Sequence, residues 1–410
     1  MNKLKLTFSQ NNSSSNSIQL PGSKSESNRW LILQQFFPEI QISNLANADD
    51  TLVLQQALKD KTGKVNIGHA GTAMRFLTAF YAANSDYHIE LYGSKRMHQR
   101  PIGNLVDALR RLGAEIDYME QDGFPPLSIK GQTLKANTID IRADQSSQFI
   151  SALLLISPSI KHNYKINFLT PPTSKTYIQH TCSILELLGY QIYFTQQQLK
   201  IRSPLQFQLP AQVKIESDWS AASYLFSWVA LSQDAILNVS YLKSSSYQAD
   251  KALPEIFSPM VDVNWKTEGI EIRKSKGQIP DEINLDLNDN PDIAQTLAVT
   301  CLGLKINCHI TGLHTLRIKE TDRLMAMKTE LEKFNAIVSI TDDSLTMIAP
   351  KQLPNRRITI STYDDHRMAM AFAALAQKTP LLIENPEVVA KSYPYFWRDF
   401  SKLGLQCVDS

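Results

Sequence analysis

The segment LVDALRRLGAEIDYM, residues 105–119, carries the pattern that decides the fold. Its apolar residues recur at helical spacing up to Leu112, Gly113 follows, and a short strand-like stretch comes next. A glycine directly after a helix is typical of a left-handed C-cap, because it has no side chain to strain that backbone conformation. The segment therefore predicts a helix, a tight cap and a strand in immediate succession.

The same pattern of helix, cap and strand recurs along the chain. It is clear in CSILELLGYQIYF (182–194) and TELEKFNAIVSI (329–340), and weaker copies lie at 54–67, 253–265 and 396–408. The breaks between helix and strand fall near Gly63, Gly113, Gly189, Val261, Asn335 and Gly404. Such segments also occur by chance in α/β proteins, so the pattern bears on architecture and not on chemistry. Six copies in two groups of three predict an α/β fold of two similar domains, each of three repeated α/β units.

The length of the chain agrees with two domains. It has 410 residues, of which 43% are hydrophobic, so it can bury two cores of ordinary size. The stretch SPLQFQLPAQVKIESDW, residues 203–219, is polar and interrupted by proline, as linkers between domains often are. We therefore expect a domain boundary near residue 215.

The composition argues against several classes of function. Lys and Arg total 42 against 40 Asp and Glu, a net charge of +2, so no bulk field attracts nucleic acid or a membrane surface. The four cysteines show no C-x-x-C spacing, which argues against a disulfide framework and a zinc site. The sequence has no signal-peptide pattern and no apolar run of the roughly 18 residues that a membrane span needs. We expect a cytoplasmic protein that needs no metal.

Positive charge recurs where helices are predicted to begin. In PGSKSESNR (21–29), Ser23 and Glu26 form a capping box, which places the helix start at Ser23 and Lys24 in the first turn. A helix N-terminus carries a partial positive charge, so a cation there is unfavourable by about 0.3–1 kcal/mol unless an anion is bound. The pattern therefore indicates a site for a negatively charged ligand.

Two later helices are predicted to begin in the same way. One, within RIKETDR (317–323), is predicted to be capped by Thr321, and the other, within YDDHRM (363–368), by Asp364 or Asp365. The charged residues around these two starts are Lys319, Glu320, Arg323, His366 and Arg367. Each such feature alone is usually structural, because an arginine on a helix is most often a solvated face.

Other predicted helix starts carry small or neutral residues with free backbone N–H groups. The residues at these starts are Gly71, Thr72, Arg75, Ser146, Ser147, Gln148, Asp218 and Pro291. Backbone N–H groups at a helix start bind phosphate or carboxylate. If several of these starts converge, together with the cations, they would hold a ligand with several negative groups, such as a small phosphorylated carboxylic acid.

These motifs, in this order, closely resemble the 5-enolpyruvylshikimate-3-phosphate (EPSP) synthase family. The resemblance runs from PGSKSESNR through RMHQRPIGNLVDALRRLGA (96–114), RIKETDRLMAMKTEL (317–331) and YDDHRMAMAFA (363–373) to AKSYP near residue 390. It implies an enolpyruvyl transferase fold with the active site in the cleft between the domains. The domains would be residues 21–215 on the shikimate 3-phosphate side, and residues 1–20 plus 216–410 on the phosphoenolpyruvate side.

The resemblance also implies the reaction and its residues. The enolpyruvyl group of phosphoenolpyruvate would pass to the 5-hydroxyl of shikimate 3-phosphate by addition and elimination, with release of phosphate, on the route to chorismate and the aromatic amino acids. We expect Asp292 to act as the base toward the hydroxyl, Glu320 to exchange the proton at C3, and Lys24 to act at the bridging oxygen. Without the resemblance, the structural interpretation would be preferred: Asp292 would be an acid that stabilises a helix dipole, and Glu320 would be an ion-pair partner of Lys319 or Arg323.

Two sets of binding residues follow from the resemblance. The predicted contacts of shikimate 3-phosphate are Lys24, Ser25, Arg29, Ser146, Ser147, Gln148, Ser174, Tyr177, Asp292 and Lys319. The predicted contacts of phosphoenolpyruvate are Lys24, His69, Gly71, Thr72, Arg100, Gln148, Arg323, His366, Arg367 and Lys391. No cofactor, metal, nucleic acid or membrane is implied, and we expect a monomer.

The chain departs from the family pattern at a few positions. His69 stands where the family usually has Asn, Phe76 where it has Pro, and Thr315 where Asn is often found. His69 and Phe76 lie at or in the helix that the resemblance places at the phosphoenolpyruvate pocket, so the sequence does not predict the response to the inhibitor glyphosate. Sensitivity, the usual behaviour, is the default expectation. Two alternatives stay open, a UDP-N-acetylglucosamine enolpyruvyl transferase and a non-catalytic anion-binding homologue. The first family typically has a reactive Cys on a loop, and RMHQRPIG contains none.

Overall fold

The chain folds into two compact units. The computed structural model describes residues 2–9, 16–160 and 162–409. One unit, here the continuous unit, spans Lys24–Ile215, and the other, here the discontinuous unit, joins Met1–Ser23 to Glu216–Ser410. The chain therefore passes between the units twice, after Ser23 and after Ile215.

The continuous unit contains two complete α/β repeats and a reduced one. In each complete repeat two strands run parallel around a crossover helix, a second helix follows, and a hairpin completes a four-stranded sheet. The first repeat consists of β4 (Thr62–Asn66), α3 (Gly71–Ala82), β5 (His88–Tyr92), α4 (Gly103–Leu112), β6 (Glu115–Tyr118) and β7 (Leu127–Lys130). The second consists of β8 (Thr138–Ile141), α5 (Ser147–Leu155), β9 (Tyr164–Phe168), α6 (Lys175–Leu187), β10 (Gln191–Phe194) and β11 (Gln198–Arg202).

The third repeat of this unit lacks the hairpin. Its only described strands, β3 and β12, pair in parallel as a two-stranded sheet. The elements are α1 (Lys24–Gln34), β3 (Gln41–Ser43), α2 (Asp49–Ala57) and β12 (Gln212–Lys214). The copy predicted near Gly63 is therefore not a single repeat unit. Its helix, α2, belongs to this repeat, and its strand, β4, belongs to the four-stranded sheet of the next one.

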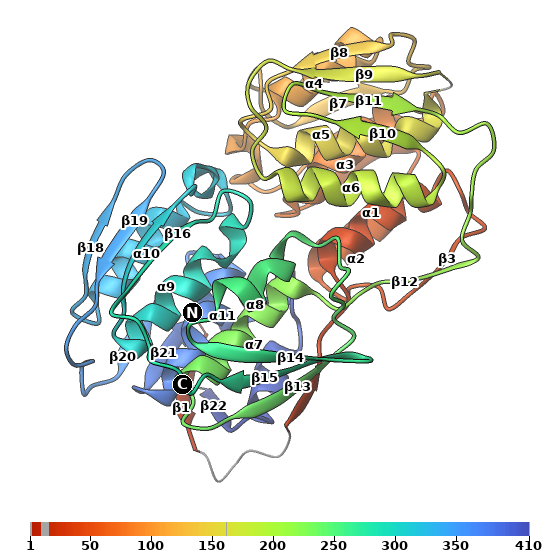
Figure 1. Ribbon diagram of the computed structural model, residues 1–410. Coiled ribbons are helices and arrows are strands. Elements are labelled where there is room, and N and C mark those ends of the chain that lie inside the picture. Colours follow the sequence, from red (N-terminus) through yellow and green to blue (C-terminus); the bar gives the residue numbers. More distant parts are fainter. Residues whose placement is uncertain (1, 10–15, 161, 410) are drawn as a thin grey trace. The chain divides into compact units, whose positions relative to one another are not determined.

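The discontinuous unit contains three repeats with four-stranded sheets, and Figure 1 shows β13, β14 and β15 of one of them side by side. The first consists of β2 (Ser17–Gln19), α7 (Trp219–Leu231), β13 (Ile236–Ser240), α8 (Leu253–Ile256), β14 (Val261–Lys266) and β15 (Gly269–Lys274). The second consists of β16 (Glu282–Asp286), α9 (Ala294–Leu304), β17 (Asn307–Thr311), α10 (Arg323–Glu332), β18 (Ile337–Ile340) and β19 (Leu345–Ile348). The third consists of β20 (Ile358–Ile360), α11 (His366–Ala373), β21 (Leu381–Glu384), α12 (Phe396–Ser401), β22 (Leu405–Asp409) and β1 (Lys3–Phe8).

The N-terminal segment supplies two strands to the discontinuous unit. β1 lies between β21 and β22 and is antiparallel to both, while β2 pairs in parallel with β13. The start of the chain thus fills the last strand position of one repeat and the first of another. Because β1 is an interior strand, both of its edges carry ladder hydrogen bonds.

The predicted repeat architecture is confirmed, with corrections at two copies. Left-handed residues follow the helices at Gly113, Gly189, Asn335 and Gly404, with φ of 105°, 97°, 67° and 100°. The copy near Val261 has its strand, but no positive φ is found at that break among the described residues. The copy near Gly63 is the one whose strand joins a neighbouring sheet.

The crossover helices are buried along most of their length. In the discontinuous unit α7, α9 and α11 pack against one another, and in the continuous unit α1, α3 and α5 do so. A helix that is apolar all round fits such a position. In α3, α5 and α7 the residues that are not buried are Thr72, Gln148 and Ser220, each in the first turn. In these three helices the first turn is therefore the part that can reach a ligand.

Among the described residues, no helix combines the length and the apolar character needed to cross a lipid bilayer. The inner helices are apolar but short, since α7, one of the longest, has 13 residues. About 20 residues are needed to span the hydrocarbon core of a membrane. The apolar character of these helices is explained by packing inside the two units.

Replacing Leu6 in β1 tests whether the N-terminal strand belongs to the core of the discontinuous unit. The Leu6 side chain is 0% exposed and lies in the main cluster of that unit. We expect Leu6→Ala to lower the free energy of unfolding by about 2–5 kcal/mol, because it leaves a cavity. Lys5→Ala, on the opposite face of β1, should change it by less than about 0.5 kcal/mol. Urea unfolding measures both, and equal effects would contradict the strand's interior position.

Candidate active site

Most of the predicted helix starts are found where the sequence placed them. α1 begins at Lys24 and α3 at Gly71. Ser146, Asp218 and Asp365 cap α5, α7 and α11, each accepting a hydrogen bond from a backbone N–H of the first turn. The start of α10 is the exception, because Asp322, and not Thr321, caps it by accepting from Met325 N. A carboxylate one residue closer to the helix replaces the hydroxyl as the acceptor.

Four cations of the discontinuous unit meet three carboxylates at the starts of α9, α10 and α11. We call these seven residues the charge cluster: Lys319, Arg323, Arg367, Lys391, Asp292, Glu320 and Asp365. Asp292 lies in the 3-10 turn Pro291–Ile293 before α9, and Lys391 ends the turn Pro386–Lys391. With all groups ionised the cluster has one cation more than it has anions.

Arg323 is at the centre of the charge cluster. Its guanidinium is 2% exposed and contacts all three carboxylates, with Nε 2.7 Å from Asp365 Oδ2, Nη2 2.8 Å from Glu320 Oε2 and Nη1 3.0 Å from Asp292 Oδ1. Burial alone would lower the pKa of Arg323, but the three carboxylates outweigh it and raise that pKa above its ordinary value. Arg323 therefore stays charged and fixes the carboxylates of three different elements.

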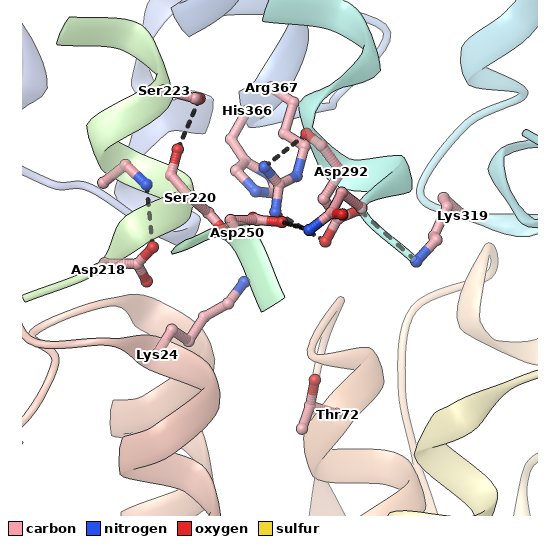
Figure 2. Close-up of polar contacts among 12 residues, drawn as sticks. Lys24, Thr72, Asp218, Ser220, Ser223, Asp250, Asp292, Lys319, His366 and Arg367 are labelled. Atoms are coloured by element: carbon pink, nitrogen blue, oxygen red, sulfur yellow. Dashed lines mark hydrogen bonds and ion pairs between the residues drawn. The ribbon is translucent and has the colours of Figure 1, made fainter. Parts of the chain in front are cut away.

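Asp292 is the carboxylate that most cations share. Its Oδ2 lies 2.9 Å from Arg367 Nη2, and its Oδ1 lies 3.7 Å from Lys319 Nζ (Figure 2). Burial would raise the pKa of Asp292, yet Arg367, Lys319 and Arg323 together bring it well below its usual range. Asp292 is therefore ionised in this structure and accepts a proton only weakly while these cations hold it.

The remaining members of the charge cluster are also held in place. Glu320 bridges Arg323 and Lys391, whose Nζ lies 2.7 Å from Glu320 Oε1. His366, which lies next to the charge cluster, is buried in the first turn of α11, with Nδ1 3.6 Å from Asp365 Oδ1.

The backbone just before α11 has an unusual conformation, because Tyr363 and Asp364 both have φ of 54°. Non-glycine residues in this conformation are often found at functional sites.

A further carboxyl group, not anticipated from the sequence, lies beside Asp292. Asp250, in the turn Ala249–Ala252, is 2% exposed and lies beside Ser220, whose Oγ donates a hydrogen bond to it (Figure 2). Asp250 also accepts a hydrogen bond from Asn290 Nδ2. Burial, and then the charge of Asp292, raise the pKa of Asp250 to about 6. No motif marks this residue, because its neighbours in the sequence, QADKAL, are those of an ordinary turn.

Arg29 joins the starts of α1 and α6 to the middle of α5 in the continuous unit. Its Nη1 donates to Ser25 O at 2.7 Å, its Nη2 donates to Tyr177 O at 3.1 Å and Ser151 Oγ at 3.4 Å, and its Nε donates to Thr181 Oγ1 at 2.8 Å. Burial lowers the pKa of Arg29 to about 10. Ser174, the residue before α6, has a left-handed φ of 49°. Tyr177 N donates to Ser174 O at 3.1 Å, so the predicted residues Ser25, Arg29, Ser174 and Tyr177 are linked.

A second contact in this unit links the starts of α3 and α5. Gln148 Nε2 donates to Thr72 Oγ1 at 3.2 Å. Gly71 lies directly beside the buried Arg100, since a Cβ added at Gly71 would lie 2.9 Å from the Arg100 Cζ atom. Absence of a side chain at Gly71 is what allows this approach.

Two predicted residues of the continuous unit have partners that the sequence did not indicate. His69 Nδ1 lies 3.0 Å from Ser94 Oγ. Lys24 Nζ lies 3.2 Å from Asp50 Oδ2, and Asp50 is buried at the start of α2. In both cases the partner is distant in sequence and lies in a segment without a motif.

The predicted site residues therefore form groups within each unit. The discontinuous unit holds Asp292, Lys319, Glu320, Arg323, His366, Arg367 and Lys391, and the continuous unit holds the others. The predicted phosphoenolpyruvate contacts are divided between the two units. Within the described residues no group of His, Cys, Asp and Glu could hold a metal ion. What both groups offer is cations and helix N-termini, which suit anionic ligands.

Comparison with known proteins assigns the family. The model of the EPSP synthase family (3-phosphoshikimate 1-carboxyvinyltransferase) matches residues 55–400. A 3-phosphoshikimate 1-carboxyvinyltransferase of Bacteroides fragilis is 41% identical over 393 residues, 95% of each chain, and one of Shewanella pealeana is 35% identical over 420 residues, 95% of this chain and 97% of that one.

Solved structures share the fold. EPSP synthase from Acinetobacter baumannii matches with a TM-score of 0.78 at 20% identity, over 100% of both chains. The enolpyruvyl transferase NikO from Streptomyces tendae matches with a TM-score of 0.73 at 16% identity, over 100% of this chain and 99% of that one. At 20% and 16% identity the solved structures establish the fold, and the family is established by the family model and the relatives of 35–41% identity. The chain belongs to the EPSP synthase (3-phosphoshikimate 1-carboxyvinyltransferase) family.

Proposed function

We propose that the chain transfers the enolpyruvyl group of phosphoenolpyruvate to the 5-hydroxyl of shikimate 3-phosphate and releases phosphate. The observation that supports this most is the charge cluster, in which Asp292 and Glu320 lie among Lys319, Arg323, Arg367 and Lys391. Addition followed by elimination needs a base for the hydroxyl, a proton donor for the methylene carbon, and cations for the phosphate that leaves. The cluster contains groups of all three kinds.

In this proposal, substrate anions compete with the carboxylates of the charge cluster for its cations. The phosphate and carboxylate of phosphoenolpyruvate bind Arg367, Arg323 and Lys391, since guanidinium groups pair well with both anions. As these cations turn toward the substrate, the pKa of Asp292 rises toward its ordinary value. Asp292 then accepts the hydroxyl proton, and Glu320 exchanges the proton at C3 of phosphoenolpyruvate. Substrate binding thereby activates the base that accepts the proton.

We also propose that the continuous unit binds shikimate 3-phosphate. Its candidate residues are Ser25, Arg29, Ser146, Ser147, Gln148, Ser174 and Tyr177, with Lys24 shared between the two substrates. Hydroxyl groups and backbone N–H groups at helix starts are suited to a phosphate, and Arg29 adds a charge that no carboxylate in its hydrogen-bond shell neutralises among the described residues. His69, Gly71, Thr72 and Arg100 of the same unit would contact phosphoenolpyruvate.

The alternative acceptor, UDP-N-acetylglucosamine, is not favoured. The curated relatives named above are 3-phosphoshikimate 1-carboxyvinyltransferases. A reactive cysteine needs an accessible thiolate. Cys182 is buried within α6, and burial, together with the charge of Glu186, raises the pKa of its thiol to about 12. This thiol is therefore inert at neutral pH.

Neutralising Asp292 or Glu320 tests the proposed proton transfers. We expect Asp292→Asn and Glu320→Gln each to lower kcat by about a hundredfold or more, because neither amide can exchange the proton. Phosphate release from phosphoenolpyruvate in the presence of shikimate 3-phosphate measures the rate. Asp262→Asn, at an exposed position of β14, is the matched control and should be unaffected. A variant that keeps normal turnover would remove its residue from the mechanism, and a wild-type chain that releases no phosphate would overturn the function.

Adding a methyl group at Gly71 tests the role of Arg100. The new Cβ of Gly71→Ala would overlap the Arg100 guanidinium and displace it. We expect the KM for phosphoenolpyruvate to rise by about tenfold or more, while the KM for shikimate 3-phosphate changes little. Gly277→Ala, where the nearest atom would be Ser275 Oγ at 3.4 Å, is the control. An unchanged KM for phosphoenolpyruvate would show that Arg100 does not contact it.

A further inference from the structure

Phe76 lies beneath the guanidinium of Arg29. Phe76 belongs to α3 and is 1% exposed, and Arg29 belongs to α1, which packs against α3. The Arg29 Cζ atom lies over the Phe76 ring, 5.6 Å from its centroid. A cation within about 6 Å of an aromatic face is attracted by the ring quadrupole, and more strongly when water is excluded. This is the geometry of a buried cation–π pair.

The hydrogen bonds of Arg29 make this contact important. All the acceptors it meets within the described residues are neutral, namely Ser25 O, Tyr177 O, Ser151 Oγ and Thr181 Oγ1. A guanidinium has five N–H donors, so these four contacts leave one donor, on Nη1, for another acceptor. Burial destabilises the charged form and lowers the pKa of Arg29 to about 10, although the charges of Tyr177 and Glu26 oppose this shift.

An aromatic face stabilises a buried cation without using its donors. A carboxylate beside Arg29 would neutralise the charge and occupy the in-plane N–H groups that a ligand anion needs. An aromatic ring such as Phe76 carries no negative charge and no hydrogen-bonding oxygen, so it stabilises the cation while the N–H donors stay available. This contrasts with Arg323 of the other unit, which is held by three carboxylates.

We infer that Phe76 is a positioning residue that stabilises and orients the buried guanidinium of Arg29, and so sets the affinity for shikimate 3-phosphate. The inference rests on the proposed function, because Arg29 is proposed there as a contact of this substrate. It concerns a feature of this chain's own sequence, since the motif that contains Phe76 usually has Pro at this position. Phe76 itself does not touch the substrate in this proposal.

A pair of phenylalanine substitutions separates this role from packing. Phe80 lies one turn further along α3, is 2% exposed, and packs against the rings of Phe36 and Tyr87. Phe76→Leu and Phe80→Leu remove the same ring from the same helix. We expect Phe76→Leu to weaken shikimate 3-phosphate binding by about fivefold to thirtyfold, the range of a desolvated cation–π contact. Phe80→Leu should change it by less than about twofold, although both variants lose stability.

The measurements are calorimetric binding of shikimate 3-phosphate and the KM of each substrate. For Phe76→Leu, we expect the KM for shikimate 3-phosphate to rise while the KM for phosphoenolpyruvate stays close to that of the wild type. In case Phe76→Leu does not fold, phenylalanine analogues with increasing numbers of ring fluorines are introduced at position 76. These keep the shape of the ring while weakening its quadrupole, so affinity should fall step by step with fluorination.

The outcomes distinguish this inference from the proposed function. A wild-type chain that does not bind shikimate 3-phosphate would refute the proposed function, and the inference with it. A wild-type chain that binds and turns over this substrate, together with Phe76→Leu and fluorinated chains of unchanged affinity, would overturn the inference alone. Equal weakening by Phe80→Leu would also overturn it, because packing would then explain both effects.

Discussion

The burial of Arg323 is the constraint on which the charge cluster depends. A guanidinium that is 2% exposed must be compensated, and here three carboxylates from the segments before α9, α10 and α11 do so. Removing one partner of a buried pair typically costs about 3–5 kcal/mol, because the other charge is left unpaired. The starts of three helices are thereby fixed together. Once they are fixed, Arg367, Lys319 and Lys391 gather around Asp292 and Glu320.

The two units stabilise the charge of a buried arginine in different ways. In the discontinuous unit, three carboxylates stabilise the charge of Arg323, and two of them, Asp292 and Glu320, are the groups proposed for proton transfer. In the continuous unit, Arg29 has carbonyl, hydroxyl and aromatic contacts, which leave its charge available to a ligand. The first arrangement suits chemistry on a ligand, and the second suits holding one. Both arise from the same repeat, whose inner helix is largely buried.

Much of this could be predicted from the sequence, because the signals are local. Helix caps such as Asp218 and Asp365 and left-handed breaks such as Gly113 depend on a few neighbouring residues. Contacts that depend on tertiary packing could not be predicted in this way. Asp250 and Asp50 lie beside Asp292 and Lys24 only after folding, and no motif marks them. The absence of a hairpin in the third repeat could not be predicted either, because the strand that contains Gly63 pairs with another sheet only after folding.

The most direct measurement is the rate of phosphate release from phosphoenolpyruvate and shikimate 3-phosphate by the Arg323→Lys variant. Lysine keeps the positive charge but cannot contact Asp365, Glu320 and Asp292 at once. If the shared guanidinium organises the catalytic groups, we expect kcat to fall by about a hundredfold or more. A variant that folds and releases phosphate at the wild-type rate would show that positive charge alone suffices and that the geometry of the cluster does not matter.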